Sequence, residues 1–179
     1  MLNPQTTALL VIDVQGKLAR SVQSSETMID NIRRMIQGAR ILGVPVVWIE
    51  QYPQGLGTTV PEIAQLLGDY SALSKTTFSC CGSDQVMDEL QRLARNQLLV
   101  CGIETHVCVY QSVAELLQRG YQVELISDAV SSRTAHNREL AMSKMASLGA
   151  TLTSTEMALF ELVGDSATDC FRDILPLVR

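Results

Sequence analysis

The chain has 179 residues and a mass of 19.6 kDa, with 46% hydrophobic and 18% charged residues. Residues 1–179 are therefore predicted to form a single domain, and a chain of this length buries about 70% of its unfolded surface. The net charge of -5 and the aromatic content of 4% argue against a nucleic-acid partner, because phosphates bind clustered basic side chains and bases stack on aromatic rings. No basic leader and no run of roughly 18 apolar residues is present, so we expect a cytoplasmic protein without a membrane partner.

Two features of the composition bear on assembly and redox state. The charged fraction is below the roughly 25% usual for soluble proteins, which predicts that part of the surface is covered in a homo-oligomer. The five cysteines are an odd number in a chain large enough to form a core, which favours reduced thiols. Cys80 and Cys81 are adjacent, so a disulfide between them would be strained.

Strands and helices alternate along the predicted chain. Continuous or β-branched apolar runs predict strands at 7–13, 44–49, 71–75, 98–102, 123–126 and 150–153. Apolar residues that recur at spacings of three and four residues predict helices at 26–42, 84–94, 107–119 and 135–148. Gly43, Gly120 and Gly149 follow three of these helices, where a left-handed residue is favoured. The alternation predicts an α/β fold, with a parallel sheet covered by helices on both faces.

Cys108 lies where a buried strand leads into a helix. If Thr105 caps that helix, the thiol falls in its first turn, and the helix dipole should lower its pKa and make it a nucleophile. The alternative is a small buried hydrophobe, which suits Cys101 and Cys170 better. Cys108 is thus the candidate nucleophile of the sequence.

Two further residues could assist a thiol. Asp13 follows five apolar residues, so its carboxylate should emerge at the carboxyl edge of the sheet and accept a proton there, although a lone Asp is more often a cap or turn residue. Lys75 follows a short strand; such a lysine is usually solvated, but beside a thiolate and a carboxylate it would favour the ionised form of both. The loop at 52–57 is a candidate pocket wall at the same edge, or an ordinary surface loop.

The sequence predicts no metal site and no cofactor. His106 and His136 are the only histidines and have no ligand spacing around them. His106 precedes Cys108 by two positions, and residues at that spacing on a helix do not face each other, which disfavours a Cys–His pair. No glycine-rich phosphate loop follows a strand.

Three segments in this order resemble the signature segments of the isochorismatase-like cysteine hydrolases. They read LVIDVQ at 10–15, SKTTF at 74–78 and GIETHVCV at 102–109, and the likeness extends from about residue 9 to 156. The segments QYPQGLG at 51–57 and SDAVSSR at 127–133 resemble an uncharacterised isochorismatase-domain branch. The resemblance implies a three-layer, Rossmann-like α/β/α fold with six parallel strands in the order 3-2-1-4-5-6.

The resemblance also implies a site. Asp13, Lys75 and Cys108 match the family's catalytic triad, and the peptide between Ile103 and Glu104 matches one that is cis in the family. The backbone N–H groups of Glu104 and Cys108 would then form an oxyanion hole. With strands one and four adjacent at the switch point, Asp13 would lie beside the helix of Cys108.

Differences between this sequence and individual branches of the family reduce the number of activities to expect. Isochorismatases proper generally lack the nucleophilic cysteine, so Cys108 favours hydrolysis of an amide-type C–N bond. Nicotinamidases carry a metal-binding Asp and His cluster after the second strand, whereas residues 50–61 contain no His. We therefore expect a metal-independent cysteine hydrolase of a small amide or carbamoyl compound, acting through an acyl-enzyme. Its possible pocket residues are Gln15, Tyr52 and Phe78, each with core packing or surface exposure as an equally good explanation.

Two alternatives remain open at this stage. One is an oligomeric binding scaffold with weak or lost catalysis, and the other is a protein whose Cys108 responds to oxidation, since an activated thiolate oxidises readily. The sequence names neither the substrate nor the number of subunits.

Overall fold

Strand β1 lies inside a six-stranded sheet whose strands are all parallel and follow the order β3-β2-β1-β4-β5-β6. The computed structural model describes residues 1–179. β1 pairs with β2 on one side and with β4 on the other, so the chain changes direction across the sheet at this point. Open α/β sheets bind their ligands outside the carboxyl ends of the strands at such a switch point.

The strands of the sheet are β1 (Thr7–Ile12), β2 (Val46–Gln51), β3 (Leu73–Lys75), β4 (Gln97–Ile103), β5 (Gln122–Ser131) and β6 (Thr151–Thr153). The helices are α1 (Gly16–Ser21), α2 (Ser25–Ile41), α3 (Pro53–Leu56), α4 (Pro61–Ala64), α5 (Asp84–Leu93), α6 (Tyr110–Gln118), α7 (Ala135–Ser147), α8 (Thr155–Val163) and α9 (Asp169–Ile174). Short 3₁₀ turns occupy Gln65–Leu67, Cys80–Gly82 and Leu175–Leu177, and a π-helical turn spans Thr105–Val109.

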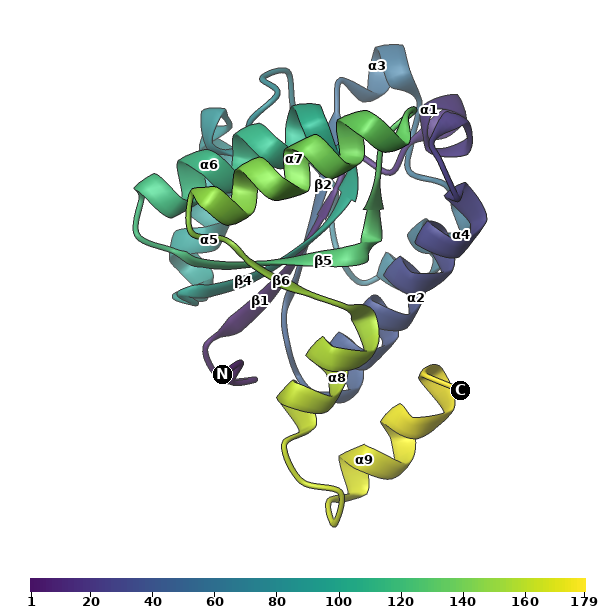
Figure 1. Cartoon of the computed structure of the whole chain (residues 1–179), viewed down its shortest axis with the longest axis vertical. Helices are drawn as coiled ribbons and strands as arrows, with labels where there is room; N and C mark the ends of the chain where they lie inside the picture. The colour runs from purple at the N-terminus through teal and green to yellow at the C-terminus, as the bar shows by residue number, and fades with distance from the viewer.

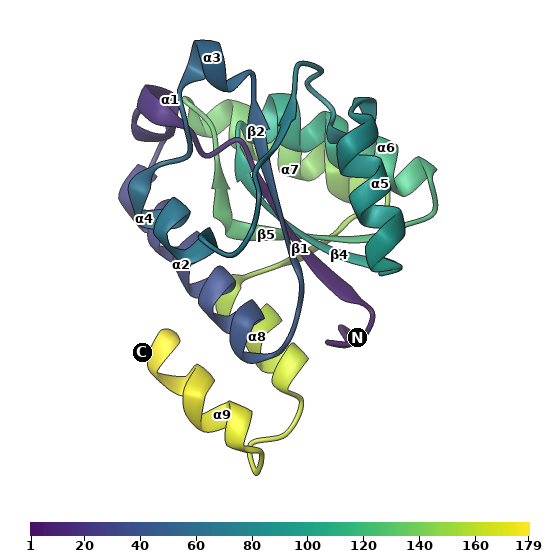
Figure 2. The same ribbon diagram turned by 180° about the vertical axis from the view of Figure 1, so that it is seen from behind.

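Helices cover both faces of the sheet. Figure 1 shows α5, α6 and α7 on one side and α2, α4 and α8 on the other, and Figure 2 shows the same arrangement from behind. Each face has its own buried apolar cluster, and successive residues of β1 alternate between the two, as Leu9 and Leu10 do. A strand buried on both faces must be apolar along its whole length, which is why β1 reads as a continuous apolar run.

The strand order and the alternation predicted above are confirmed. Several element ends differ, and the helices α1, α3, α4, α8 and α9 lie outside the predicted helix ranges. β5 has ten residues and runs to Ser131, well beyond the predicted 123–126, because its later part pairs with the end of β4 after a register shift. β2 begins at Val46 and not at residue 44, and Pro45 before it has no N–H to donate. Gly43, which follows α2, has a φ of 66°, as predicted for a residue that ends a helix.

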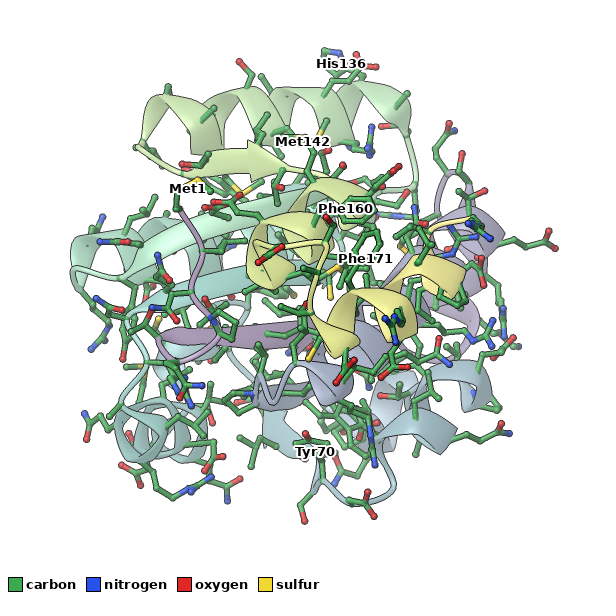
Figure 3. All side chains as sticks on the ribbon, turned by 90° about the horizontal axis from the view of Figure 1, so that it is seen from below. Met1, Tyr70, His136, Met142, Phe160 and Phe171 are labelled. Carbon is green, nitrogen blue, oxygen red and sulfur yellow. The ribbon has the colours of Figure 1, made fainter.

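Helices α8 and α9 were not predicted and form the C-terminal part of the fold. Figure 3 shows Phe160 and Phe171 side by side, and their ring centroids are 6.1 Å apart. α8 and α9 pack against each other, and both pack against α2. None of the helices has the length and apolar character needed to cross a membrane.

Candidate active site

Three side chains from three different elements meet at the carboxyl edge of the sheet. Asp13 follows β1 directly, Lys75 ends β3, and Cys108 lies in the π-helical turn after β4. Lys75 Nζ is 2.7 Å from Asp13 Oδ2, and all three residues are buried. The three residues that the sequence pointed to are thus neighbours, although 95 positions separate the first from the last.

The Asp13 carboxylate is held close to the end of β1 by an unusual backbone. Its φ is 56°, in the left-handed region that non-glycine residues rarely adopt, and its N–H donates to the Ile49 carbonyl at 3.0 Å. Burial raises the pKa of Asp13, and the positive charge of Lys75 opposes this only in part. The second oxygen, Oδ1, is buried and accepts no hydrogen bond. Asp13 is therefore a better base than an exposed aspartate and has one free acceptor atom.

The Lys75 ammonium has four acceptors around it. Besides Asp13 Oδ2, these are Gln51 Oε1 at 2.5 Å and the carbonyls of Phe78 at 3.1 Å and Thr77 at 3.2 Å. A buried cation is tolerated only when it is paired and hydrogen-bonded. These four acceptor atoms therefore stabilise the charged ammonium within the site and fix its position.

The turn that carries Cys108 differs from the predicted helix start. Thr105 does not cap it: Glu104 holds the N-cap position, and Thr105 Oγ1 is buried without a partner. Burial, and then the negative charge of Asp13, raise the pKa of the Cys108 thiol to about 12. The predicted lowering of this pKa is wrong, because the thiol loses contact with water and faces a carboxylate, and these effects outweigh the positive charge of Lys75.

The segment before Cys108 provides a candidate oxyanion hole. The Ile103–Glu104 peptide bond is cis, and the Glu104 N–H donates to no acceptor of the chain. The Glu104 carboxylate is occupied elsewhere, since its Oε1 accepts from Arg133 Nε at 3.0 Å and from the Arg133 backbone N–H at 3.2 Å. Glu104 can thus present its backbone donor while its side chain stays fixed.

Gln51 is a site residue that the sequence reasoning missed. Its Oε1 accepts from Lys75 and lies 4.0 Å from Cys108 Sγ. The signal available in the sequence was its place at the end of a buried strand, the same position that singled out Asp13. Gln15, expected as a pocket wall, is fully buried and donates to the carbonyls of Gln51 and Gly57.

A cavity of about 440 Å³ lies beside β3, and Lys75 is the one member of the Asp13, Lys75 and Cys108 group in its lining. Its lining includes Tyr52, Lys75 and Thr76, together with residues of the turn before α5. Tyr52 is 52% exposed and has a φ of 35°, in the left-handed region. Phe78 is equally exposed and contributes its carbonyl to Lys75, while its ring lies outside this lining. Helices α1 and α3 lie beyond the ends of β1 and β2 (Figures 1 and 2), and Pro53 and Gln54 of α3 belong to the cavity lining.

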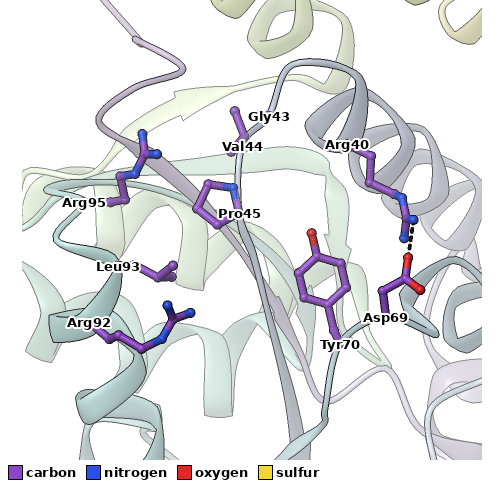
Figure 4. Close-up of a pocket in the computed structure, with 9 residues that line it drawn as sticks. All are labelled: Arg40, Gly43, Val44, Pro45, Asp69, Tyr70, Arg92, Leu93 and Arg95. Carbon is purple, nitrogen blue, oxygen red and sulfur yellow. Dashed lines mark hydrogen bonds and ion pairs between the residues drawn. The ribbon is translucent and has the colours of Figure 1, made fainter.

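Another cavity, of about 650 Å³, lies away from this site. Figure 4 shows that Arg40, Arg92 and Arg95 surround it, with Asp69 paired to Arg40. Its walls come from the end of α2, the start of β2 and the end of α5, which is the amino edge of the sheet. No residue of the Asp13 site lines it.

The two histidines are separate from the thiol. His106 Nδ1 lies 3.0 Å from Ser132 Oγ, and it has no contact with Cys108 Sγ among the hydrogen bonds of the site. No group of three or more His, Cys, Asp and Glu side chains is arranged to hold a metal ion.

Comparison with known proteins places this arrangement in a family. Residues 7–157 match the model of the isochorismatase domain. A cattle protein named isochorismatase domain-containing protein 2 is 42% identical over 180 residues, which cover 98% of this chain and 84% of the relative. Both matches extend over the three segments that carry Asp13, Lys75 and Cys108.

Solved structures share the fold. A Caenorhabditis elegans structure described as the MAR1 ribonuclease is 39% identical, covers 99% of this chain and 91% of its own, and has a TM-score of 0.93. The Escherichia coli YcaC gene product, described as an octameric hydrolase of unknown specificity, has a TM-score of 0.93 at 20% identity, with 98% and 89% of the two chains covered; at that identity the likeness concerns the fold alone. The chain therefore belongs to the isochorismatase domain family and is a hydrolase of that family.

Proposed function

We propose that this protein is a metal-independent cysteine hydrolase that cleaves a small amide-type C–N bond through an acyl-enzyme. Asp13, Lys75 and Cys108 are its proposed catalytic residues. The observation that carries the proposal is the pairing of Lys75 Nζ and Asp13 Oδ2, at 2.7 Å, beside a buried thiol. A base, a fixed positive charge and a nucleophile within one site are what covalent catalysis of acyl transfer requires.

In the proposed first half-reaction, the Cys108 sulfur attacks the carbonyl carbon of the substrate while its proton passes to Asp13. The carbonyl oxygen becomes an oxyanion that accepts hydrogen bonds from the backbone N–H groups of Glu104 and Cys108. Asp13 then returns the proton to the nitrogen, the C–N bond breaks, and an amine or ammonia leaves. The acyl group remains on Cys108 as a thioester.

In the second half-reaction, water attacks the thioester and Asp13 accepts one of its protons. The C–S bond breaks, a carboxylic acid leaves, and the proton on Asp13 restores the Cys108 thiol. Because both groups have raised pKa values, the thiol is protonated at neutral pH and is ionised only as it attacks. The Lys75 ammonium stabilises the negative charge that moves between Asp13 and Cys108.

A small substrate fits the surroundings of this site better than RNA does, although one relative is described as a ribonuclease. The cavity near Lys75 has a volume of about 440 Å³, within the usual range for small-molecule pockets. The protein carries a net charge of -5, and Asp84 is among the residues that line this cavity. A phosphate backbone would meet negative charge there.

The alternatives raised by the sequence are less well supported. Oxidation of Cys108 requires its thiolate, and the raised pKa of this thiol disfavours that form at rest. A pure binding scaffold would not need a buried ammonium and carboxylate pair beside a thiol, since burying such charges is costly.

The proposal is tested with a panel of small amides and carbamoyl compounds assayed by ammonia release. In the unaltered protein, we expect mass spectrometry to detect a covalent adduct during turnover. Cys108→Ala should abolish both the turnover and this adduct. Cys170→Ala, a change of the same kind at a half-exposed C-terminal position, serves as the matched control and should keep full activity. A Cys108→Ala protein that hydrolyses an identified substrate at an unaltered rate would disprove the assignment of the nucleophile.

A further inference from the structure

Two glutamine side chains connect the ends of β1 and β2 to the proposed reacting groups. Gln15 follows β1 by three residues, and Gln51 is the last residue of β2. Both are buried, with exposed fractions of 0% and 8%. Burial of an amide is tolerated when its hydrogen bonds are made, and the amide nitrogen and oxygen of both side chains have partners.

Gln15 fixes the backbone of Gln51. Its Oε1 accepts from the Gln51 N–H at 2.6 Å, and its Nε2 donates to the Gln51 carbonyl at 3.0 Å. The same Nε2 donates to the Gly57 carbonyl at 2.6 Å, and together these two bonds connect the last residue of the 52–57 loop to the residue that precedes the loop. The main chain at Gln51 therefore has one position relative to β1.

The side-chain amide of Gln51 also has one orientation. Its Nε2 donates to the Thr76 carbonyl at 2.7 Å, and its Oε1 accepts from Lys75 Nζ at 2.5 Å. The carbonyl can only accept and the ammonium can only donate, so a flipped amide would lose both bonds. Oε1 is thereby held against the ammonium and 4.0 Å from Cys108 Sγ.

We propose that Gln51 is a positioning residue of the hydrolase site, whose Oε1 holds the Lys75 ammonium where it stabilises the Cys108 thiolate. The inference rests on the proposed function, because that function makes Lys75 and Cys108 reacting groups. Its bond to Lys75 is the shortest of the four that the ammonium makes, and Asp13 supplies the next. Without Oε1, the ammonium would keep Asp13 and two longer carbonyl contacts and would be drawn away from the thiol.

The test measures alkylation of Cys108 by iodoacetamide at pH 8, followed by mass spectrometry of the peptide that contains this residue. It needs no substrate. Only the thiolate reacts, so the rate reports how well the site stabilises that form. We expect Gln51→Met, which has a similar length and no acceptor, to slow the alkylation by about fivefold or more.

Gln51→Glu is the second variant. It keeps the shape and an oxygen for Lys75, and it places a negative charge next to the sulfur. Because like charge disfavours the thiolate, we expect it to slow alkylation at least as much as Gln51→Met does. Gln91→Met, at an exposed position of α5, is the control and should alter the rate by less than about twofold.

If Gln51 only supported the packing of the site, its replacement would loosen that packing. Cys108 would then be more exposed, and its alkylation would be faster and not slower. An unaltered or faster rate in both Gln51 variants would overturn the inference. Once a substrate is known, kcat should fall by about tenfold or more in these variants, with KM nearly unaltered. Failure of the hydrolase proposal would appear separately, as turnover that survives Cys108→Ala.

Discussion

At the scale of single residues, the site combines a base and a nucleophile that both resist ionisation. Burial raises the pKa of Asp13 and of Cys108, and the negative charge of Asp13 raises that of Cys108 further. At rest, Cys108 is therefore a protonated thiol next to a base, and not a thiolate paired with a cation. Little thiolate is present at rest, so attack on a carbonyl group requires transfer of the thiol proton to Asp13.

The raised pKa of Asp13 has a direct kinetic consequence. Asp13 must be ionised to accept the thiol proton, so kcat/KM should fall as the pH falls through its pKa in the free enzyme. Because that pKa is raised, the acid limb should lie above about pH 4, the usual value for aspartate. Asp13→Asn should lower kcat/KM by about 100-fold or more. An acid limb at or below pH 4 in the unaltered protein would contradict the role of Asp13.

At the scale of elements, the site depends on the close approach of two strands. Gly102 in β4 has a φ of 120°, and a Cβ added there would lie 2.0 Å from the Ile12 carbonyl oxygen of β1. Only glycine permits this contact. Because Asp13 follows β1 and the turn of Cys108 follows β4, the approach of these strands brings base and nucleophile together.

Gly102→Ala should therefore destabilise the fold and disrupt the site. The added methyl group must push β1 and β4 apart in a close-packed sheet, so we expect a loss of about 3 kcal/mol or more in the free energy of unfolding. Gly43→Ala is the matched control: its φ is 66°, but nothing lies within 4 Å of the added Cβ, and it should cost only about 1 kcal/mol. Urea unfolding measures both, and equal losses would refute the steric explanation.

At the scale of the whole molecule, two properties follow from what is buried and what is exposed. Burial raises the pKa values of Cys101 and Cys108, and a hydrogen bond with Cys81 together with burial raises that of Cys80. These thiols therefore stay protonated in the folded protein where they would ionise in the unfolded chain. Several large apolar side chains remain on the surface, among them Leu140, Leu148, Leu152 and Met157 on and around α7, β6 and α8.

The buried thiols predict a loss of stability in alkali. Above about pH 9 the unfolded chain releases thiol protons that the folded protein retains, so the free energy of unfolding falls as the pH rises, by about 1.4 kcal/mol per thiol and pH unit. Cys101→Ala removes one such thiol, whose pKa is raised by burial alone, and should flatten the slope by that amount. Urea unfolding at pH 9 to 10 tests this, and an unaltered slope would count against it.

The exposed apolar side chains, together with the low charged content, favour a homo-oligomer. Sedimentation velocity at micromolar concentration should show a species heavier than the 19.6 kDa chain. Sedimentation of the protein as a species with the mass of one chain would contradict this expectation. The fold-sharing Escherichia coli protein is described as an octamer, but at 20% identity the subunit number of this protein has to be measured.

The sequence by itself determined the alternation of strands and helices, the buried character of β1 and the identity of the candidate residues. These are local properties: apolar periodicity, glycines after helices, and polar residues at the ends of apolar runs. Even the strand order needed a resemblance to a family, because pairing is set by contacts between segments far apart in the chain. Asp13 and Cys108 were identified by local position, and that reasoning did not require them to touch.

Only the tertiary structure decided the electrostatics and the partners. The pKa of Cys108 was predicted to fall from its place at a helix start, yet burial and the neighbouring Asp13 raise it. Gln51 drew no attention in the sequence because an amide has no charge or nucleophile, and its role depends on its two partners, Lys75 and Thr76, across a sheet edge. Desolvation and hydrogen bonding are properties of the packed molecule, so the residue types alone could not determine them.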